Sequence, residues 1–561
     1  IGGMIGVDAA GSHAFRVGST RDHIQSVQCV LIGGQVLELG REDAHDEYSI
    51  HQPVTFVQQP PIRSAGVIPP VRNENLALSA LTAATRKADL IERLSAVLKE
   101  SADAIKEHQP PLFRNCSGYM LRGILNSQRL DFPRLIAGAE GTLGMVTEVT
   151  LHTMPISRFR GMTVLMFGSM DAALRAMQLL LILEPSACDL LDRRLLSLGR
   201  DADIRFMDIV RSDAEAGLFM EFNGVSQEDV ERRIASARIL LESTDYQHVA
   251  TKTAYDSADI ELLWSLPGSV VSLLAGLKGS SRPLPFVEDI AVPPESISRF
   301  LTLAQKTFQK HEVTATLYAH AASGQLHLRP MLPVPQPGHC EQIEAIARDL
   351  YRHVKSVGGT ISGEHGDGLS RTAFIRTQYG PLYRAFQQVK DIFDPQHLLN
   401  PDKIVSNDGQ LTIRHIRNSV AVAEPDAESV QTALLPILQL NCSNQEAMDT
   451  ATRCNGCGSC RTLEESLRMC PFFHQEQVEE NSPRSKANLM RRMVSGEEEF
   501  EVMATDEARR VAESCFNCKQ CELECPSNVD IPHLMLEARA QNVAVHGLNK
   551  TDWLLSRFHT Y

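Results

Sequence analysis

Apolar residues recur at helical spacing in long segments of the chain. Residues 75–108 carry Leu90, Leu94 and Leu98 four positions apart, which predicts an amphipathic helix that packs on a neighbouring domain. A further helix is predicted to start at Ser482, because a serine cap precedes a proline at the first helical position. After residue 526 the apolar residues again follow a helical spacing, so the C-terminal part is expected to be mostly helical.

Strand and turn signals alternate in two other places. Residues 27–31 and 35–39 are typical of two β-strands, with Gly33-Gly34 as the hairpin turn between them. Ser323-Gly324 also suits a two-residue turn, which would pair residue 320 with residue 327. His320 and His327 would then stand directly opposite each other, with Cβ atoms roughly 5 Å apart. That spacing could chelate one divalent ion, although a histidine pair in a hairpin is more often structural.

Composition limits the possible classes of function. A chain of 561 residues, 43% of them hydrophobic and 22% charged, is expected to form about three globular domains. The net charge of −14 argues against a nucleic-acid partner, which would require a basic face. No apolar run approaches 18 residues, so no membrane span is expected, and we expect a cytoplasmic protein that could contact the inner face of the membrane. The chain begins inside a glycine-rich motif, which predicts a piece of a longer polypeptide.

The thirteen cysteines fall into two groups. Five are scattered and are predicted to be buried small apolar residues, namely Cys29, Cys116, Cys188, Cys340 and Cys442. The other eight lie between residues 454 and 525, in two copies of C-x2-C-x2-C followed by C-P. This spacing is typical of two [4Fe–4S] clusters, in which the fourth cysteine of each motif serves the other cluster. A pair of zinc sites is the alternative, but zinc sites favour two separated C-x2-C pairs and do not require a third cysteine at the same spacing.

The rule that the fourth cysteine of each motif binds the other cluster, here called the crossed rule, gives each cluster a predicted set of ligands. The first set is Cys454, Cys457, Cys460 and Cys525, and the second is Cys470, Cys515, Cys518 and Cys521. The first motif has nine residues before its Cys-Pro where the second has the usual three. A domain with two such clusters stores and passes single electrons.

Two glycine-rich segments stand near the start of the chain. The first runs from Gly2 to Gly11 and on to Asp22, and the second reads Gly138-Ala139-Glu140-Gly141-Thr142-Leu143-Gly144. Dense small residues let the backbone approach a flat or anionic cofactor closely. Together with Asn115-Cys116-Ser117-Gly118-Tyr119, the segments closely resemble the FAD-linked oxidases of the vanillyl-alcohol oxidase type, in the branch that includes D-lactate, glycolate and D-2-hydroxyglutarate dehydrogenases.

The resemblance implies a set of FAD-binding residues. The family's first pyrophosphate-binding loop precedes the point where this chain begins, so only the C-terminal part of the FAD-binding domain is expected here. The residues that the resemblance assigns to the FAD site are Ala9, Ala10, Gly11, Ser12, Gly18, Arg21, Asp22, Ser117, Gly118, Glu140, Gly141, Thr142, Gly144 and Asn400.

A second set of implied residues concerns a metal and a base. The family carries a [GA]-E-H-G motif, which is matched here by Gly363-Glu364-His365-Gly366. The resemblance implies that His320, His327 and Glu364 bind a divalent metal (Zn, Mn or Fe), with Asp367 as the alternative to Glu364, and that His365 is the catalytic base. Many relatives also use an Arg in L-W-x-x-R to hold the substrate carboxylate. Here Pro267 occupies that position, and Lys278, Arg282 or Arg329 could substitute.

The resemblance implies an α+β multidomain protein. We expect the C-terminal part of a vanillyl-alcohol oxidase/p-cresol methylhydroxylase-type FAD-binding domain, an α+β ferredoxin-like substrate domain and a mostly helical di-[4Fe–4S] domain, in the order of the large bacterial fused D-2-hydroxyglutarate dehydrogenases. The expected boundaries are 1–155 for the FAD-binding domain, 156–405 for the substrate and metal domain, 406–440 for a linker, 441–545 for the cluster domain and 546–561 for a tail.

The implied activity is oxidation of a small D-2-hydroxy acid. D-2-hydroxyglutarate is the first choice and D-lactate or glycolate the next, with electrons passing through FAD and the clusters to an external acceptor such as a quinone or a carrier protein. An oligomer is possible. The alternative is a non-catalytic electron-transfer component of a larger complex, which Pro267 and the missing loop favour and His365 with its neighbours opposes.

Overall fold

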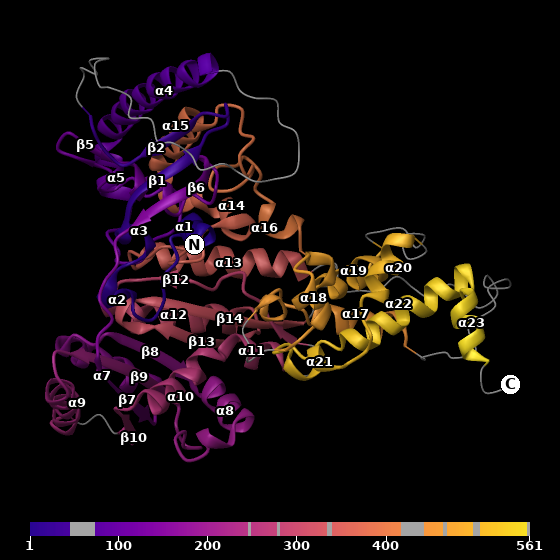
Figure 1. Cartoon of the computed structure of the whole chain (residues 1–561). Helices are drawn as coiled ribbons and strands as arrows, with labels where there is room; N and C mark the ends of the chain where they lie inside the picture. Colours follow the sequence, from indigo (N-terminus) through magenta and orange to yellow (C-terminus); the bar gives the residue numbers. More distant parts are fainter. Residues whose placement is uncertain are drawn as a thin grey trace. The chain divides into compact units, whose positions relative to one another are not determined.

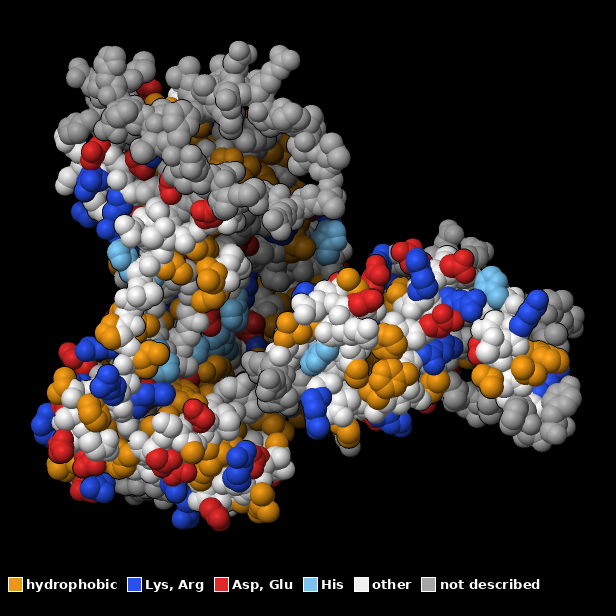
Figure 2. All heavy atoms as spheres, viewed as in Figure 1, with side chains coloured by type: hydrophobic (Ala, Val, Ile, Leu, Met, Phe, Trp, Pro, Cys, Tyr) orange, Lys and Arg blue, Asp and Glu red, His pale blue; other side chains and the backbone are white. Residues whose placement is uncertain are grey.

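The computed structural model describes residues 1–44, 73–244, 248–277, 281–333, 339–416, 442–463, 468–496 and 505–557. It contains two compact units (Figure 1). The first comprises residues 1–268, 284–331 and 341–415, and the second comprises residues 269–283, 332–340 and 416–561. Most of the predicted linker at 406–440 lies outside the described residues. On the face drawn in Figure 2, basic and acidic side chains of the described residues are interspersed.

The N-terminal part of the first unit is built on a small antiparallel sheet. Its strand order is β2-β1-β6, and the β1–β2 hairpin confirms the predicted strand pair. Gly34 takes a positive φ of 78° in the turn, where its amide donates to the Leu31 carbonyl. The elements of this part are α1 (Gly2–Val7), α2 (Ala14–Val17), α3 (Thr20–His23), β1 (Ile24–Val30), β2 (Val36–Leu39), β3 (Arg41–Asp43), α4 (Asn73–Glu100), α5 (Ala102–His108), β4 (Leu125–Asn126), β5 (Arg129–Asp131), α6 (Phe132–Ile136) and β6 (Met145–Leu151).

The long helix predicted within residues 75–108 is confirmed as α4 followed by α5. Leu90, Leu94 and Leu98 are buried, and α4 packs on β2 and on α15 (Tyr383–Phe393). Their spacing of four residues places the three leucines on one face of the helix. Burial of that face explains why this segment is helical.

The rest of the first unit is centred on a larger antiparallel sheet, whose strands follow the order β10-β7-β9-β8-β13-β14, with β12 paired to β14. Strands β7, β8 and β9 are buried almost throughout. The elements are β7 (Phe159–Phe167), α7 (Met170–Leu180), β8 (Ala187–Asp192), α8 (Arg193–Ala202), β9 (Ala216–Gly224), α9 (Gln227–Glu242), β10 (His248–Ala254), α10 (Ser257–Gly268), β12 (Ile290–Ala291), α12 (Ile297–Lys310), β13 (Thr314–His320), β14 (Gln325–Pro333), α13 (His339–Ser356), α14 (Gly368–Tyr379), α15 and α16 (Leu411–Arg414).

The register predicted for the β13–β14 hairpin is wrong. His320 pairs with Gln325, and His327 pairs with Tyr318. Residues 321–324 form a four-residue connection because Ala321–Ser323 take one 3₁₀ turn and Gly324 follows at a φ of 76°. The two histidines still lie on the same face of the sheet, as diagonal neighbours with ring centroids 5.3 Å apart.

A buried carboxylate in β9 joins three other segments of the first unit. Glu221 accepts hydrogen bonds from Arg160 Nε and Nη2 at 3.0 and 2.9 Å and from Trp264 Nε1 at 2.7 Å. His13 Nε2 lies 3.3 Å from the same carboxylate. Burial would raise the pKa of Glu221, but the hydrogen bonds from His13 and Arg160 outweigh it and lower the pKa to about 2.

Replacing Glu221 with glutamine is expected to destabilise the first unit by about 2–4 kcal/mol at pH 7. A carboxyl with a depressed pKa in the folded state contributes stability above its unfolded pKa of about 4.3 and loses it as the pH falls toward 2. Calorimetric unfolding at pH 7 and at pH 3 checks this, because the difference between wild type and variant is expected to shrink at pH 3. An equal difference at both pH values would contradict the role of the charge.

One stretch of the described residues, Ser257–Ala275, is long and apolar enough, by length and composition alone, to be a candidate membrane span. It consists of α10 and α11, which are separated by Ser269. Ile260, Leu263 and Leu266 of α10 are buried in the protein. A single stretch of this kind is weak evidence, because core helices meet the same two criteria.

The second unit is mostly helical, as predicted. Ser482 accepts a hydrogen bond from the Ser485 amide at the start of α19, with Pro483 at the first helical position, which confirms the predicted cap. The core includes Met448, Ala487, Met490 and Leu534. The elements are α11 (Val270–Ala275), β11 (Ser281–Pro283), α17 (Asn444–Thr452), α18 (Pro471–Gln475), α19 (Pro483–Val494), α20 (Asp506–Glu513), α21 (Gln520–Glu524), α22 (Ile531–His546) and α23 (Lys550–Ser556).

Candidate active site and cluster cavities

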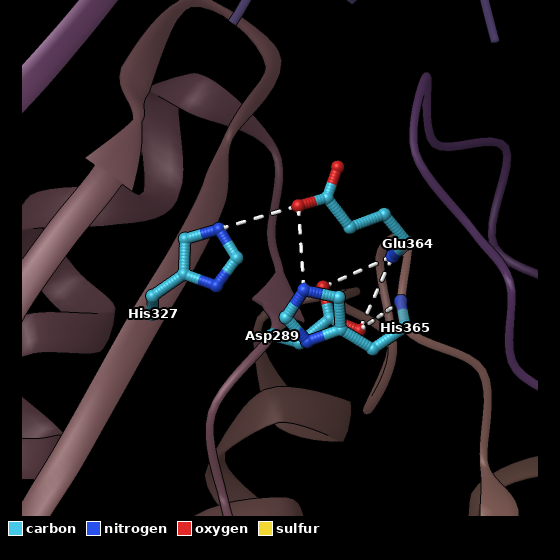
Figure 3. A group of neighbouring side chains, drawn as sticks. All are labelled: Asp289, His327, Glu364 and His365. Carbon is cyan, nitrogen blue, oxygen red and sulfur yellow. Dashed lines mark hydrogen bonds and ion pairs between the residues drawn. The ribbon is translucent and has the colours of Figure 1, made fainter. Parts of the chain in front are cut away.

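Three histidines converge on one carboxylate in the first unit. Glu364 Oε1 lies 3.5 Å from His327 Nε2, 3.5 Å from His365 Nε2 and 3.7 Å from His320 Nε2. Figure 3 shows His327 and His365 reaching the same oxygen from β14 and from the loop before α14. The side chains of His320 and His327 are less than 10% exposed, whereas that of His365 is 40% exposed. His365 is therefore the histidine of the three that is open to a small molecule.

Part of this group has unmet hydrogen-bonding capacity. Within the described residues, Glu364 Oε2 is buried and accepts no hydrogen bond, and the Arg114 guanidinium stands 3.9 Å away. Ligand atoms of His327, Glu364, His365 and Asp289 all lie within 4.8 Å of one another. A buried carboxylate oxygen without a donor, among imidazole nitrogens, fits a divalent cation. His320 lies outside the group of four but within 3.7 Å of Glu364.

A hydrogen-bond network fixes the orientation of His320. Asp189 Oδ1 lies 3.0 Å from His320 Nδ1, and its Oδ2 accepts from Ser12 Oγ at 2.7 Å and from the Tyr318 hydroxyl at 2.5 Å. This leaves Nε2 of His320 as the nitrogen that faces Glu364. Ser12, which the resemblance assigns to FAD, thus supports the histidine pair in this structure.

The two buried histidines differ in charge. Burial opposes the charged form of His320, but the Asp189 carboxylate outweighs it and raises the pKa to about 10. Burial and the nearby charge of His320 lower the pKa of His327 to about 4. His327 is therefore neutral near pH 7, which is the form that binds a metal, whereas His320 holds a proton that a bound cation would displace.

Asp289 holds the loop that carries Glu364 and His365. Its carboxylate accepts hydrogen bonds from the amides of Glu364 (3.0 Å) and His365 (2.8 Å), and from the side chains of Gln325 and Ser362 (each 2.7 Å). Figure 3 shows the Asp289 carboxylate beside the two backbone nitrogens, with dashed lines joining them. Because both oxygens already accept several hydrogen bonds, we interpret Asp289 as a positioning residue rather than a ligand.

Glu288 faces the other ring nitrogen of His365. Its Oε1 lies 3.3 Å from His365 Nδ1, and its Oε2 accepts from Arg329 Nε at 2.7 Å. Burial lowers the pKa of His365, but the hydrogen bond to Glu288 and the nearby carboxylates outweigh this effect, and the pKa lies above its usual value. Nε2 of His365 is thus the nitrogen left to exchange a proton near Glu364.

Two of the three candidate replacements for the missing family arginine, Arg329 and Arg282, interact with other groups. Arg329 pairs with Glu288, and Arg282 donates to the Leu277 carbonyl. Lys278 lies outside the described residues, and Pro267 is buried inside α10. Arg114, which the sequence did not indicate, is buried beside Glu364.

A cavity of about 270 Å³ is lined by glycines of both predicted FAD segments. Gly2 and Gly6 come from the first segment, and Gly141 and Gly144 from the second. A Cβ added at Gly2, Gly6 or Gly141 would meet no described atom within 4 Å, so each glycine leaves open space that a side chain would fill. Such a lining fits a flat cofactor that approaches the backbone.

Most of the other residues assigned to FAD are hydrogen-bonded within the protein. Arg21 forms a buried ion pair with Asp8 (2.6 Å) and Asp22 accepts from the Ser19 amide (2.9 Å). Similar internal bonds are made by Ser117 to Asn115, Gly118 to Asp367, Thr142 to Tyr119 and Asn400 to the Glu140 carbonyl. Gly18 has a φ of 86°, and Ala9, Ala10 and Gly11 connect α1 to α2. Among the described residues that line the glycine-lined cavity, none is one of these, so their assignment to FAD stays a prediction.

Glu140 connects the second glycine segment to the loop that carries His365. Its carboxylate accepts from the amides of Asp367 (2.6 Å) and Gly368 (2.9 Å) at the start of α14. These amides follow His365 by two and three residues, so the second glycine segment and the histidine loop are joined directly. Asp367, the alternative ligand, is fully buried, and burial with the Glu140 charge raises its pKa to about 8.

The eight clustered cysteines of the second unit line two cavities. Cys454, Cys457, Cys460 and Cys525 line one, and Cys470, Cys515 and Cys518 line the other, while Cys521 borders both. Burial is the main cause that raises the pKa of Cys460 to about 11 and that of Cys521 to about 12, and the charges of nearby cysteines add to it. Thiols gathered this closely fit a cationic metal cluster, and their grouping follows the crossed rule.

Comparison with known proteins matches these two regions. Residues 156–404 match the family described as FAD linked oxidases, C-terminal domain, and residues 450–529 match the 4Fe-4S dicluster domain. The chain joins an FAD-linked oxidase domain to a 4Fe-4S dicluster domain. Its α+β fold class is the one that the sequence predicted, and the two matches support FAD and iron–sulfur clusters as its cofactors.

Some relatives align along most of the chain and others along half of it. The D-2-hydroxyglutarate dehydrogenase of Haemophilus influenzae is 25% identical over 583 residues, which cover 95% of this chain and 52% of that protein. The glycolate oxidase subunit GlcD of Bacillus subtilis is 27% identical over 284 residues, covering 50% of this chain and 58% of the relative. A solved alkyldihydroxyacetonephosphate synthase aligns with a TM-score of 0.39 at 14% identity, over 72% of this chain and 58% of that one. The chain spans about half the length of the D-2-hydroxyglutarate dehydrogenases that it matches.

The sequence did not indicate several residues that surround the histidines. None of them belongs to a glycine or histidine motif, and they are Arg114, Asp189, Glu288 and Asp289. The signal that could have found them is an acidic residue inside an apolar strand segment, such as Asp189 in Ala187–Asp192. A buried carboxylate requires a donor or a cation nearby.

Proposed function

We propose that this chain oxidises a small D-2-hydroxy acid to the 2-oxo acid, with D-2-hydroxyglutarate as the first candidate and D-lactate or glycolate as the next. The observation that carries the proposal is the convergence of His327, His320 and half-exposed His365 on Glu364, beside the segment that contains Glu140. The alignment with D-2-hydroxyglutarate dehydrogenases over 95% of the chain supports the substrate class.

We assign the divalent metal to His320, His327 and Glu364. The donor set of two imidazoles and a carboxylate, with positions left open, is typical of catalytic Zn, Mn or Fe sites. When bound, such a cation withdraws electron density from a substrate hydroxyl and lowers its pKa. Asp189 keeps Nε2 of His320 toward Glu364, and Asp289 keeps the Glu364 side chain in place through the backbone amides.

His365 takes the hydroxyl proton in this proposal. Its Nδ1 faces Glu288, so the proton is accepted at Nε2, and the Glu288 carboxylate stabilises the resulting imidazolium. FAD supplies the hydride acceptor, and Gly2, Gly6, Gly141 and Gly144 are assigned to its binding. The two cysteine sets would hold the clusters, which would supply single-electron transfer to an external acceptor, either a quinone or a carrier protein.

Asp189→Asn is expected to weaken metal binding at the histidine site by about 10–100-fold, because an amide no longer fixes the tautomer of His320. The measurement is metal content after dialysis against buffers of graded free metal. Asp192→Asn is the matched control, since Asp192 lies in the same strand and accepts hydrogen bonds from the backbone amides of Leu195 and Leu317. Equal affinity in wild type and Asp189→Asn would contradict the orienting role of Asp189.

The proposed activity is tested by anaerobic absorption of the protein loaded with FAD and clusters. D-2-hydroxyglutarate is expected to bleach the flavin band first and the cluster bands next, and L-2-hydroxyglutarate is expected to leave both unchanged. D-lactate and glycolate, added separately, rank the substrates. If dithionite bleaches both bands but none of the acids does, the catalytic proposal is wrong and the chain is an electron-transfer component.

A further inference from the structure

A second group of ligand-type side chains lies in the cluster unit, apart from the eight cysteines that line the cavities. Cys442, His533 and Glu537 place one ligand atom each within 4.8 Å of the other two. His533 and Glu537 are one helical turn apart on α22, so both project from the same face. Cys442 immediately precedes the Ser443 cap of α17 and packs on the core of the unit.

The hydrogen-bonding environment of Glu537 favours a bound cation. Its Oε1 is buried and, within the described residues, accepts no hydrogen bond, while His533 Nε2 stands 3.7 Å away. A buried carboxylate oxygen that lacks a hydrogen-bond donor is stabilised by a bound cation.

The second ring nitrogen of His533 faces an acidic residue. Asp530 Oδ2 lies 4.0 Å from His533 Nδ1, and Asp530 Oδ1 caps α22 by accepting from the His533 amide at 3.0 Å. At 4.0 Å this carboxylate makes no hydrogen bond to the ring, but it favours a positive charge on the imidazole side. Nε2 of His533 lies 3.7 Å from Glu537 Oε1 and is therefore the ring nitrogen that faces Glu537.

We propose that Cys442, His533 and Glu537 form a zinc site. One thiolate, one imidazole and one carboxylate are the ligand types that Zn²⁺ accepts, with a fourth tetrahedral position left for water, whereas Ca²⁺ and Mg²⁺ prefer oxygen alone. Cys442 lines neither of the two cysteine cavities. The zinc clamps the start of α17, the helix that leads into Cys454, to α22, the helix that follows Cys525.

The test measures zinc, iron and sulfide per chain in cluster-loaded protein equilibrated with Zn²⁺ and desalted. His327→Ala is used as the background, so that the histidine site does not contribute. About one zinc per chain is expected. Cys442→Ser and Glu537→Gln are each expected to abolish it while iron and sulfide stay unchanged, and Cys340→Ser, at another partly buried cysteine, is the control that keeps it. Zinc that persists in Cys442→Ser, or is absent from the background protein, overturns the proposal.

Zinc X-ray absorption of the otherwise unaltered protein gives a second test that does not depend on the variants folding. A sulfur shell at about 2.3 Å is expected, with about half a sulfur per zinc if zinc also fills the histidine site and about one if it does not, because the histidine site contains no cysteine. A spectrum without sulfur assigns the zinc to the histidine site alone. A spectrum with three or four sulfurs assigns it to vacant cluster sites. Either spectrum would contradict the proposed site.

Discussion

His365→Gln is expected to slow flavin reduction by the hydroxy acid by about 10²–10⁴-fold, the usual contribution of a general base. Of the three histidines around Glu364, His365 is the one whose side chain is substantially exposed, and Glu288 behind Nδ1 leaves Nε2 to accept the substrate proton. Glutamine keeps a polar group of similar reach but accepts no proton at neutral pH. The measurement is the rate of flavin bleaching after anaerobic mixing.

Two further measurements separate proton transfer from structural damage. FAD and metal contents are expected to match wild type, and added imidazole is expected to restore part of the lost rate. His311→Gln is the matched control, because His311 pairs with Asp349 outside this site and its loss is expected to leave the rate unchanged. A fall of less than about fivefold in His365→Gln would exclude His365 as the base.

Serine substitutions of four cysteines are expected to remove clusters in crossed pairs. Cys460→Ser and Cys525→Ser should each lose one cluster, and Cys470→Ser and Cys518→Ser should each lose the other. Iron content is expected to fall by about four atoms of about eight, because one cluster of two is lost. The reason is geometric, since Cys525 lines the same cavity as Cys460, and Cys470 the same cavity as Cys518.

Electron paramagnetic resonance of the reduced variants identifies which cluster remains. The two variants of a pair are expected to lack the same signal, while flavin reduction by substrate persists and transfer to an external acceptor falls. Cys340→Ser is expected to retain both signals. If Cys525→Ser and Cys518→Ser lack the same signal, each motif binds its own cluster and the crossed assignment is wrong.

Features encoded by short sequence patterns were predictable. The Gly33-Gly34 turn, the Ser482 cap and the spacing of Leu90, Leu94 and Leu98 specify local hydrogen bonds or one helix face, and all three predictions are confirmed. Of the five scattered cysteines, Cys29, Cys116 and Cys188 are buried as predicted, and Cys340 and Cys442 are partly exposed.

The hairpin register was not predictable because a distant segment sets the turn. A Cβ at Gly324 would lie 1.9 Å from the Val292 carbonyl oxygen, so the turn is packed against a strand end that is far away in the sequence. Ser323-Gly324 suits a two-residue turn when it is considered alone. In the structure, the turn that packs against the Val292 backbone has four residues. His320 and His327 are therefore diagonal neighbours.

The sequence by itself determined the residue types that carry the chemistry: the cysteine spacing, the glycine segments and the Glu364-His365 pair. The tertiary structure alone decided how these residues are held, since Asp289 supports the Glu364 loop, Asp189 orients His320 and Glu140 joins two segments more than 200 residues apart. Ligand spacing is local and is therefore visible in the sequence. A buried carboxylate is instead satisfied by whichever donors the fold brings to it, and these donors follow no sequence spacing.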